Sequence, residues 1–220
     1  MAVNIERYKE VVAELLKQNI TLVAVSKTKP NQDISDLYNS GQRDFGENYV
    51  QELVDKHAVL PSDIRWHFIG HLQTNKAKYI APFVHLIHGV DSFKLLKEIN
   101  KQAARCGRVI DCLLQVHIAQ EETKFGMDEA ELKEVQTNMS SLPNVQISGL
   151  MGMASLSDDP EMVRSEFRNL KSIYDRYCKW TTDREQWTIL SMGMSSDYRI
   201  AIEEGSTMVR IGSLLFGSRQ

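Results

Sequence analysis

A lysine closes the first strongly apolar run of the chain. The run TLVAVSK, from Thr21 to Lys27, is rich in β-branched residues, as expected for a strand buried on both faces. At the desolvated mouth of a barrel, near other positive charge, a lysine has a lowered pKa and a free amine that can attack an aldehyde. A single lysine is more often a solvated surface residue. Lys27 is therefore a candidate Schiff-base lysine that needs support from other residues.

Two turns rich in glycine and serine follow the last two apolar runs. The first, SMGMSSD, precedes a helical pattern, and the second, VRIGS, closes the final run. Helix N-termini offer backbone N–H groups to anions, and barrels commonly bind a phosphate after strands seven and eight. Together the turns predict a phosphate site, although each alone is ordinary turn chemistry. The candidate groups are Gly193, Ser195, Ser196, Asp197, Gly212 and Ser213.

Arg210 lies inside the last predicted strand, two residues before Gly212. A buried arginine needs a partner. A cofactor ring or a phosphate would serve, and so would an ion pair with Glu47 or Asp91 across the barrel. The sequence leaves both interpretations open.

Paired histidines raise the question of a metal. His67 and His71 frame WHFIGH, and His85 and His88 frame HLIH. On an extended strand four residues span about 13 Å, too far for His67 and His71 to share one ion. We therefore predict no metal site, with His67 as a hydrogen-bonded core residue and His71 at the barrel mouth.

The elements that must position these groups alternate along the chain. Eight strand-like runs separated by helical patterns predict an α/β fold, a single (β/α)₈ barrel, in preference to an open α/β sheet. An extra amphipathic helix, Ile5 to Lys17, precedes the repeat and could cap the bottom of the barrel. The predicted strands are 21–27, 44–47, 66–69, 84–90, 110–118, 146–150, 188–191 and 208–211, and the helices between them are 32–39, 49–57, 76–80, 93–105, 129–140, 161–177 and 197–204.

Composition narrows the class of protein. The 220 residues suit one domain, residues 1–220, and a net charge of −3 without a basic stripe argues against nucleic acid. Three cysteines without C-x-x-C spacing argue against a disulfide framework. With neither an apolar leader nor a membrane-length apolar run, we predict a cytoplasmic protein. The G-x-S-x-G, P-loop, G-x-G-x-x-G and H-E-x-x-H motifs are also missing.

Several sequence blocks, in order, resemble one family. They are AVSKTKP (24–30), FGENYVQEL (45–53), WHFIGHLQTNK (66–76), TKFGM (123–127), GLMGMAS (149–155) and LSMGMSSDYRIAIEEGSTMVRIGSLLFGSR (190–219). On these blocks the chain resembles the YggS/PROSC family of proteins that bind pyridoxal 5'-phosphate (PLP), also called PLP homeostasis proteins. The resemblance covers almost the whole chain.

The resemblance implies a fold and a set of cofactor contacts. The fold is a barrel like the N-terminal domain of alanine racemase, of the fold-type III kind, with Lys27 as the Schiff-base lysine. Asn48 is expected beside the PLP ring and Arg210 at the pyridine nitrogen, where it weakens the ring as an electron sink. The phosphate is expected on Ser195, Gly212 and Ser213, and Met192 and Thr207 are also expected to line the site.

The implied function is intracellular PLP (vitamin B6) homeostasis without turnover. The racemases have a second, β-rich domain that supplies a tyrosine base, and the chain has no residues to encode it. We expect a monomer that carries PLP and passes it to apo-enzymes. One alternative is a small fold-type III enzyme, such as an amino-acid racemase, with Lys27 and either His71 or another residue of the mouth as bases; a lysine aldolase barrel without PLP is another. The roles of His71 and Lys124, and a second B6 vitamer site, stay open.

Overall fold

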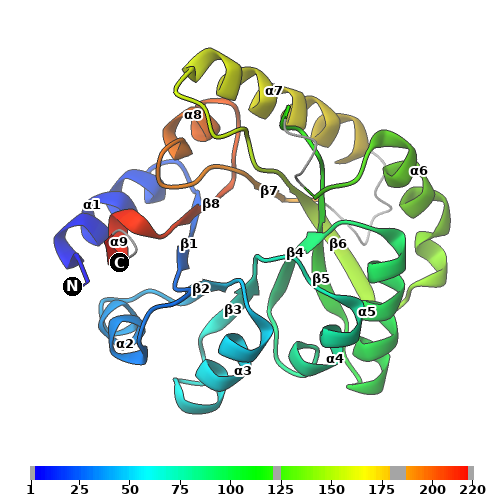
Figure 1. The fold of residues 1–220 in the computed structure, drawn as a ribbon, viewed down its shortest axis with the longest axis horizontal. Coiled ribbons are helices and arrows are strands. Elements are labelled where there is room, and N and C mark those ends of the chain that lie inside the picture. Colours follow the sequence, from blue (N-terminus) through cyan, green and yellow to red (C-terminus); the bar gives the residue numbers. More distant parts are fainter. Residues whose placement is uncertain (1–2, 121–124, 179–186, 218–220) are drawn as a thin grey trace.

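Eight parallel strands close into a barrel surrounded by helices (Figure 1). The structure is a computed structural model and describes residues 3–120, 125–178 and 187–217. Neighbours in sequence pair in order, and β8 closes the ring on β1 with Thr21 opposite Met208 and Ala24 opposite Ile211. The strands are β1 (Thr21–Val25), β2 (Asp44–Glu47), β3 (Arg65–Phe68), β4 (Leu86–Val90), β5 (Ile110–Gln115), β6 (Val145–Met151), β7 (Ile189–Ser191) and β8 (Met208–Ile211).

The helices form the outer ring in Figure 1. They are α1 (Ile5–Leu16), α2 (Asn31–Asn39), α3 (Val50–Val59), α4 (Ala77–Ile80), α5 (Phe93–Arg105), α6 (Glu129–Asn138), α7 (Pro160–Tyr177), α8 (Tyr198–Glu203) and α9 (Ser213–Phe216), with 3₁₀ turns η1 (Thr74–Lys76) and η2 (Met139–Ser141). The predicted barrel is thus confirmed, and most predicted boundaries lie within a few residues of those observed. The sequence did not predict α9, because four residues are too few for a helical pattern. No helix among the described residues is both long and apolar enough to span a membrane.

The expectation that the first helix caps the bottom of the barrel is wrong. Helix α1 lies in the outer ring beside α9 (Figure 1), where the Asn4 N–H donates to Leu215 O at 2.9 Å. Its apolar stripe of Tyr8, Val11 and Leu15 is buried. Within the described residues the helix after β8 is the four-residue α9, and α1, which contacts both β1 and α9, covers the seam between β8 and β1.

The barrel interior is polar as well as apolar. A small apolar cluster of Val23, Leu86, Leu113, Met151 and Met208 is separate from the large core between strands and helices. Buried polar side chains, among them His67, His88, Ser191 and Arg210, accompany the small cluster on inward-facing positions of the strands. Polar groups inside a barrel must be hydrogen-bonded, and these four are bonded to one another in sequence through the barrel.

Candidate functional site

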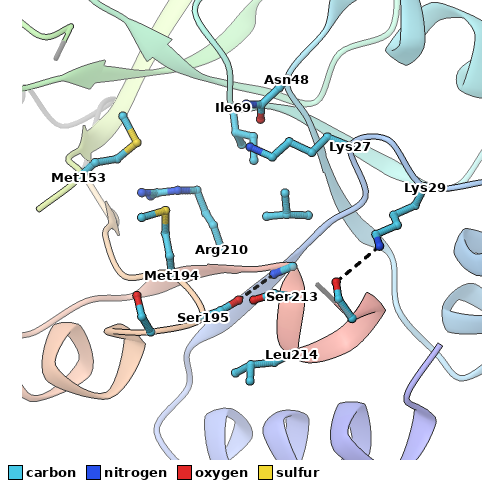
Figure 2. Close-up of a pocket in the computed structure, with 14 residues that line it drawn as sticks. Lys27, Lys29, Asn48, Ile69, Met153, Met194, Ser195, Arg210, Ser213 and Leu214 are labelled. Atoms are coloured by element: carbon cyan, nitrogen blue, oxygen red, sulfur yellow. Dashed lines mark hydrogen bonds between the residues drawn. The ribbon is translucent and has the colours of Figure 1, made fainter. Parts of the chain in front are cut away.

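A cavity of about 500 Å³ opens at the carboxyl ends of the strands. This volume is within the range of small-ligand sites. In Figure 2 Lys27 reaches in beside Asn48 and Ile69, while Ser195 and Ser213 lie near one another at the start of α9. The lining residues are Val25, Lys27, Lys29, Asn48, Ile69, Met153, Met194, Ser195, Ser196, Arg210, Gly212, Ser213, Leu214 and Gly217.

Lys27 is placed by a sharp change of backbone direction after β1. The Ser26 N–H still follows the sheet and donates to Gly46 O at 3.0 Å. Thr28, one residue after Lys27, has φ of 63°, in the left-handed region that β-branched residues rarely adopt. Its N–H donates to Glu52 Oε1 at 2.6 Å. The strand ends at Val25, and the bend at Thr28 lets the Lys27 side chain enter the cavity.

A buried ion pair lies behind Lys27. Lys56 Nζ is 2.8 Å from Glu47 Oε1 and 2.6 Å from Glu52 Oε1, and it also donates to Ser26 O at 2.8 Å. Burial raises the pKa of Glu47, and Lys56 and the Ser26 hydroxyl oppose that rise. The cluster fixes the backbone on both sides of Lys27, because Ser26 O and the Thr28 N–H are both bonded to it.

Asn48 presents an unused acceptor at the cavity. Its Oδ1 is buried and has no hydrogen-bond partner among the described residues. The backbone there is crowded, since a Cβ placed on Gly70 would lie 2.3 Å from Asn48 O. Glycine at 70 thus lets β3 and β2 approach closely. A buried amide oxygen without a partner is costly, so a ligand that donates to it would be favoured.

Arg210 is a buried cation held by neutral groups. Its NH1 donates to Ser191 O at 2.9 Å and to Ser191 Oγ at 2.6 Å, and its NH2 donates to Gly152 O at 3.0 Å. Burial lowers the pKa of Arg210 to about 10. The alternative of an ion pair with Glu47 or Asp91 is wrong, because Glu47 bonds Lys56 and Asp91 bonds His71. The guanidinium therefore borders the cavity, and its hydrogen-bond partners within the described part of the chain are neutral.

The two predicted phosphate turns meet at the cavity. The Gly212 N–H donates to Ser195 Oγ at 3.2 Å, and Ser213 is the first residue of α9. The first N–H groups of a helix have no partner within it and point outward. The first turn is tightened by Asp197, whose Oδ1 accepts from the Met194 N–H at 2.6 Å.

Two predicted site residues lie elsewhere. Met192 is fully buried in the core between strands and helices, since it shares the outer face of the chain with Leu190, two residues before it. Met194 lines the cavity in its place. Thr207 precedes β8, so it lies at the opposite end of the barrel and bonds Leu190 N and Thr188 O. Both expectations are wrong as statements about this cavity.

His71 is near the mouth but outside the cavity lining. Its Nδ1 is 2.9 Å from Asp91 Oδ2, and its ring stacks on Phe125 with centroids 4.1 Å apart. It borders a separate surface hollow with Asp91. Lys124 lies outside the described residues.

Sequence reasoning missed several residues that line the cavity, of which Lys29 is the most informative. Its Nζ donates to Phe216 O at 3.0 Å and so ties the loop after β1 to the end of α9. Met153 and Met194 supply apolar walls. The signal was present in AVSKTKP and GLMGMAS, where Lys29 and Met153 follow strand ends as Lys27 does.

A chain of hydrogen bonds leads from Arg210 to the other end of the barrel. After Ser191, His88 Nδ1 is 3.1 Å from Ser191 Oγ, His88 Nε2 is 2.9 Å from His67 Nδ1, and His67 Nε2 is 2.9 Å from Asp44 Oδ1. The prediction that His67 is a hydrogen-bonded core residue is confirmed. Arginine can only donate and an ionised carboxylate can only accept. Burial lowers the pKa of His88 well below its usual value, and with a proton on Nε2 of each histidine every bond in the chain runs from Arg210 to Asp44.

Known proteins are similar to this chain over nearly its whole length. Residues 2–220 match the family described as alanine racemase, N-terminal domain. The pyridoxal phosphate homeostasis protein of Aquifex aeolicus is 44% identical over 204 residues, which cover 90% of this chain and 87% of that protein. The human protein of the same name is 40% identical over 209 residues, covering 90% of this chain and 76% of its own length.

Solved structures give the same picture. PipY of Synechococcus elongatus with PLP bound has a TM-score of 0.85 and 37% identity, and the match covers 97% of this chain and 99% of PipY. The alanine racemase of Bartonella henselae, with covalently bound pyridoxal phosphate, has a TM-score of 0.73 and 16% identity, with coverage of 97% of this chain and 59% of the racemase. At that identity the racemase supports the fold alone.

Proposed function

The chain belongs to the alanine racemase N-terminal domain family and, within it, to the pyridoxal phosphate homeostasis proteins, and we propose on this premise that it binds PLP at the mouth of its barrel. The observation that carries the proposal is that Lys27, Asn48 and Arg210 line one cavity. The turns that contain Ser195 and Gly212, which are joined by a hydrogen bond, line the same cavity. A relative of 37% identity is known with PLP bound.

The chemistry of the cavity fits PLP. When bound, PLP supplies an aldehyde that condenses with a lysine amine with loss of water, and Lys27 offers that amine. The buried Oδ1 of Asn48 could accept a hydrogen bond from the cofactor, and the Arg210 guanidinium would offer a donor to the ring nitrogen. The N–H groups at the start of α9 and the hydroxyls of Ser195 and Ser213 suit a phosphate.

Arg210 has a second consequence for the proposed function. The guanidinium keeps its proton even at its lowered pKa of about 10, so it donates to a pyridine nitrogen and leaves that nitrogen unprotonated. A ring in that state is a weak electron sink, which disfavours carbanion chemistry. The proposal is therefore that the chain holds and releases PLP for apo-enzymes and does not turn over a substrate.

Lys27 is tested against its neighbour Lys29, which lines the same cavity. The purified chain is incubated with PLP, reduced with borohydride and mapped by mass spectrometry. We expect a pyridoxyl phosphate adduct on the peptide with Lys27. The adduct should disappear in Lys27→Ala and persist in Lys29→Ala. An adduct confined to Lys29, or no adduct on either lysine, would refute the proposed site.

The carrier and enzyme alternatives differ in proton exchange. A racemase must remove the α-proton of an amino acid, which allows solvent deuterium to enter, whereas a carrier need not. His71, the second base considered for a racemase, is paired with Asp91 outside the cavity lining. We expect no deuterium in a panel of common amino acids and transfer of PLP to an apo-enzyme. Exchange that disappears in Lys27→Ala would favour the racemase.

A further inference from the structure

A second cavity, also of about 500 Å³, opens at the amino ends of the strands, which we call the floor of the barrel. It is on the opposite side from Lys27, since its lining includes Thr21 and Met208, the first residues of β1 and β8. Its other lining residues are Asn19, Asp44, Arg65, His67, His85, Leu86, Asp111, Ser148, Thr188, Ile189 and Thr207. Most of these are polar, and the proposed PLP function uses none of them.

Three of the floor residues converge. Asp44, His67 and His85 each offer one ligand atom, and these atoms all lie within 4.8 Å of one another. The topology explains the approach: Asp44 begins β2, His67 is in β3, and His85 immediately precedes β4. Adjacent parallel strands thus bring the three side chains to one point. The sequence reasoning tested His67 with His71, on one strand, and so missed a group that is assembled from three.

We propose that Asp44, His67 and His85 form a binding site for a divalent transition-metal ion of the Zn²⁺ class. Two imidazoles and one carboxylate are a ligand set that Zn²⁺ takes at about 2.0–2.2 Å, distances that small side-chain movements can reach from this geometry. The set is too rich in nitrogen for Mg²⁺ or Ca²⁺, which prefer oxygen ligands. The cavity in front of the trio leaves the remaining coordination position to water or a small anion.

His67 is already oriented for this role. Metal-binding histidines commonly have the second ring nitrogen fixed by a hydrogen bond, and His67 Nδ1 is 2.9 Å from His88 Nε2. A metal on Nε2 of His67 would move the ring proton from Nε2 to Nδ1, which then donates to His88. His88 would likewise move its proton to Nδ1 and donate to Ser191 Oγ, whose hydroxyl rotates away. With one proton on each ring, the His67–His88 and His88–Ser191 bonds reverse, while Arg210 still donates to Ser191.

Arg65 is the group that a metal must accommodate. It donates to both carboxylate oxygens of Asp44, with its Nε 2.7 Å from Oδ1. The Arg65 side chain is 48% exposed, so it can release Oδ1 and keep Oδ2, or turn into water. Oδ1 is also the oxygen that faces His67 Nε2 at 2.9 Å, so the metal would replace the proton now shared by these two atoms.

The test uses Co²⁺, which reports tetrahedral coordination by its visible d–d bands. The full chain is stripped with a chelator and titrated with Co²⁺, and Zn²⁺ is then added as a competitor. We expect bands that Zn²⁺ removes. His85→Ala should weaken Co²⁺ binding at least about 10-fold. Loss of a residue that only supports a metal ligand already weakens metal binding by about 10-fold or more, and His85 is proposed as a ligand itself. Since His85 is exposed, this variant should fold normally.

Two controls separate the site from others in the chain. His57→Ala removes a histidine that stacks on Phe83 and is not part of the floor lining given above, and it should bind Co²⁺ as the parent chain does. Lys27→Ala should also bind Co²⁺ normally, so the metal site stands or fails independently of the PLP site. Absence of d–d bands at millimolar Co²⁺, or equal bands in His85→Ala and the parent, would overturn the proposal.

Discussion

The two ends of the barrel present opposite chemistry on the same scaffold. Among the residues that the structure describes, the mouth is lined by the cations Lys27, Lys29 and Arg210, with hydroxyls and methionines and without a carboxylate. The floor carries the carboxylates Asp44 and Asp111 with two histidines and one arginine. An anionic ligand is therefore favoured at one end and a cationic one at the other. Neither end is isolated, because the chain of hydrogen bonds through His88 and His67 joins them.

The ends also differ in how their charges are buried. The Lys56–Glu47 pair behind the mouth has side chains 6% and 0% exposed, whereas Arg65 in the floor pair with Asp44 is 48% exposed. Asp44 is only 10% exposed, but it keeps its contact with His67 when Arg65 is lost, whereas loss of Lys56 removes the cation that is bonded to the fully buried Glu47. The same kind of substitution should thus have very different costs at the two ends.

Lys56→Met should produce the largest effect. It leaves Glu47 buried without its cation, which costs about 3–5 kcal/mol in the free energy of unfolding, against about 1 kcal/mol for Arg65→Met at the floor. Urea unfolding followed by circular dichroism measures both. Similar losses in the two variants would contradict the contrast in burial.

The pH dependence of Lys56→Met gives a second measurement on that variant. Burial already raises the pKa of Glu47 in the folded chain, and loss of Lys56 raises it further. A carboxyl with a raised folded-state pKa destabilises the protein as pH rises above its unfolded value, about 4.3. The loss should therefore be small near pH 4 and full at neutral pH. In Lys56→Met with Glu47→Gln, the pH-dependent part should disappear.

A double-mutant cycle should show whether the ends are coupled. Ser191→Ala removes the hydroxyl between Arg210 and His88, and Asp44→Asn replaces the carboxylate that orients His67. Residues in one hydrogen-bond network usually interact by about 0.5–3 kcal/mol, while independent sites add within about 0.5 kcal/mol. We expect a coupling free energy of about 1 kcal/mol from chemical denaturation.

Ser148→Ala is the matched control for that cycle. Ser148 is also a floor residue, but its hydroxyl donates to Asp111 at 2.9 Å, outside the chain from Arg210 to Asp44. The change in the free energy of unfolding caused by Ser148→Ala should add to the change caused by Ser191→Ala, with no coupling free energy between them. Additive behaviour of Ser191→Ala with Asp44→Asn as well would mean that the two ends are energetically separate.

The mouth was predictable from sequence to a degree that the floor was not. Lys27, Gly212 and Ser213 follow apolar runs, and the carboxyl ends of barrel strands meet at one face. Asp44, His85 and Thr207 precede such runs, so the same rule applied to strand beginnings predicts a second polar surface. Thr207 directly precedes β8 and so lies at the floor, which contradicts the expectation drawn from the family resemblance.

Other features depended on three-dimensional detail. The convergence of Asp44, His67 and His85 requires the register of three strands, in which Asp44 lies opposite Arg65 and His67 opposite Leu86. The place of Met192 depends on which face an alternating strand turns inward, and a shift of one residue reverses it. The Lys56–Glu47 pair joins β2 to α3, and no spacing in the sequence distinguishes Lys56 from the other lysines of the helices.

Backbone strain gives the last and smallest contrast, at the two ends of β1. Thr28 at the mouth has φ of 63°, and Asn19 at the floor has φ of 56°. Both side chains are exposed, so a substitution at either position tests the backbone with little change in packing. Asparagine tolerates the left-handed region far better than a β-branched residue does. The turn at Asn19 is therefore relaxed, and the turn at Thr28 is strained.

Exchanging the residue types should therefore have opposite effects. Thr28→Asn should raise the free energy of unfolding by about 1 kcal/mol, or roughly 2–4 °C in Tm by calorimetry, and Asn19→Thr should lower it by a similar amount. The hydrogen bond from the Thr28 N–H to Glu52 is made by the backbone and survives the substitution. Stabilisation by Thr28→Asn would mean that the chain retains strain beside Lys27 at a measurable cost, as expected where a bend positions a functional side chain. Destabilisation by Thr28→Asn would show that the threonine side chain, and not the bend, is what the mouth requires at this position.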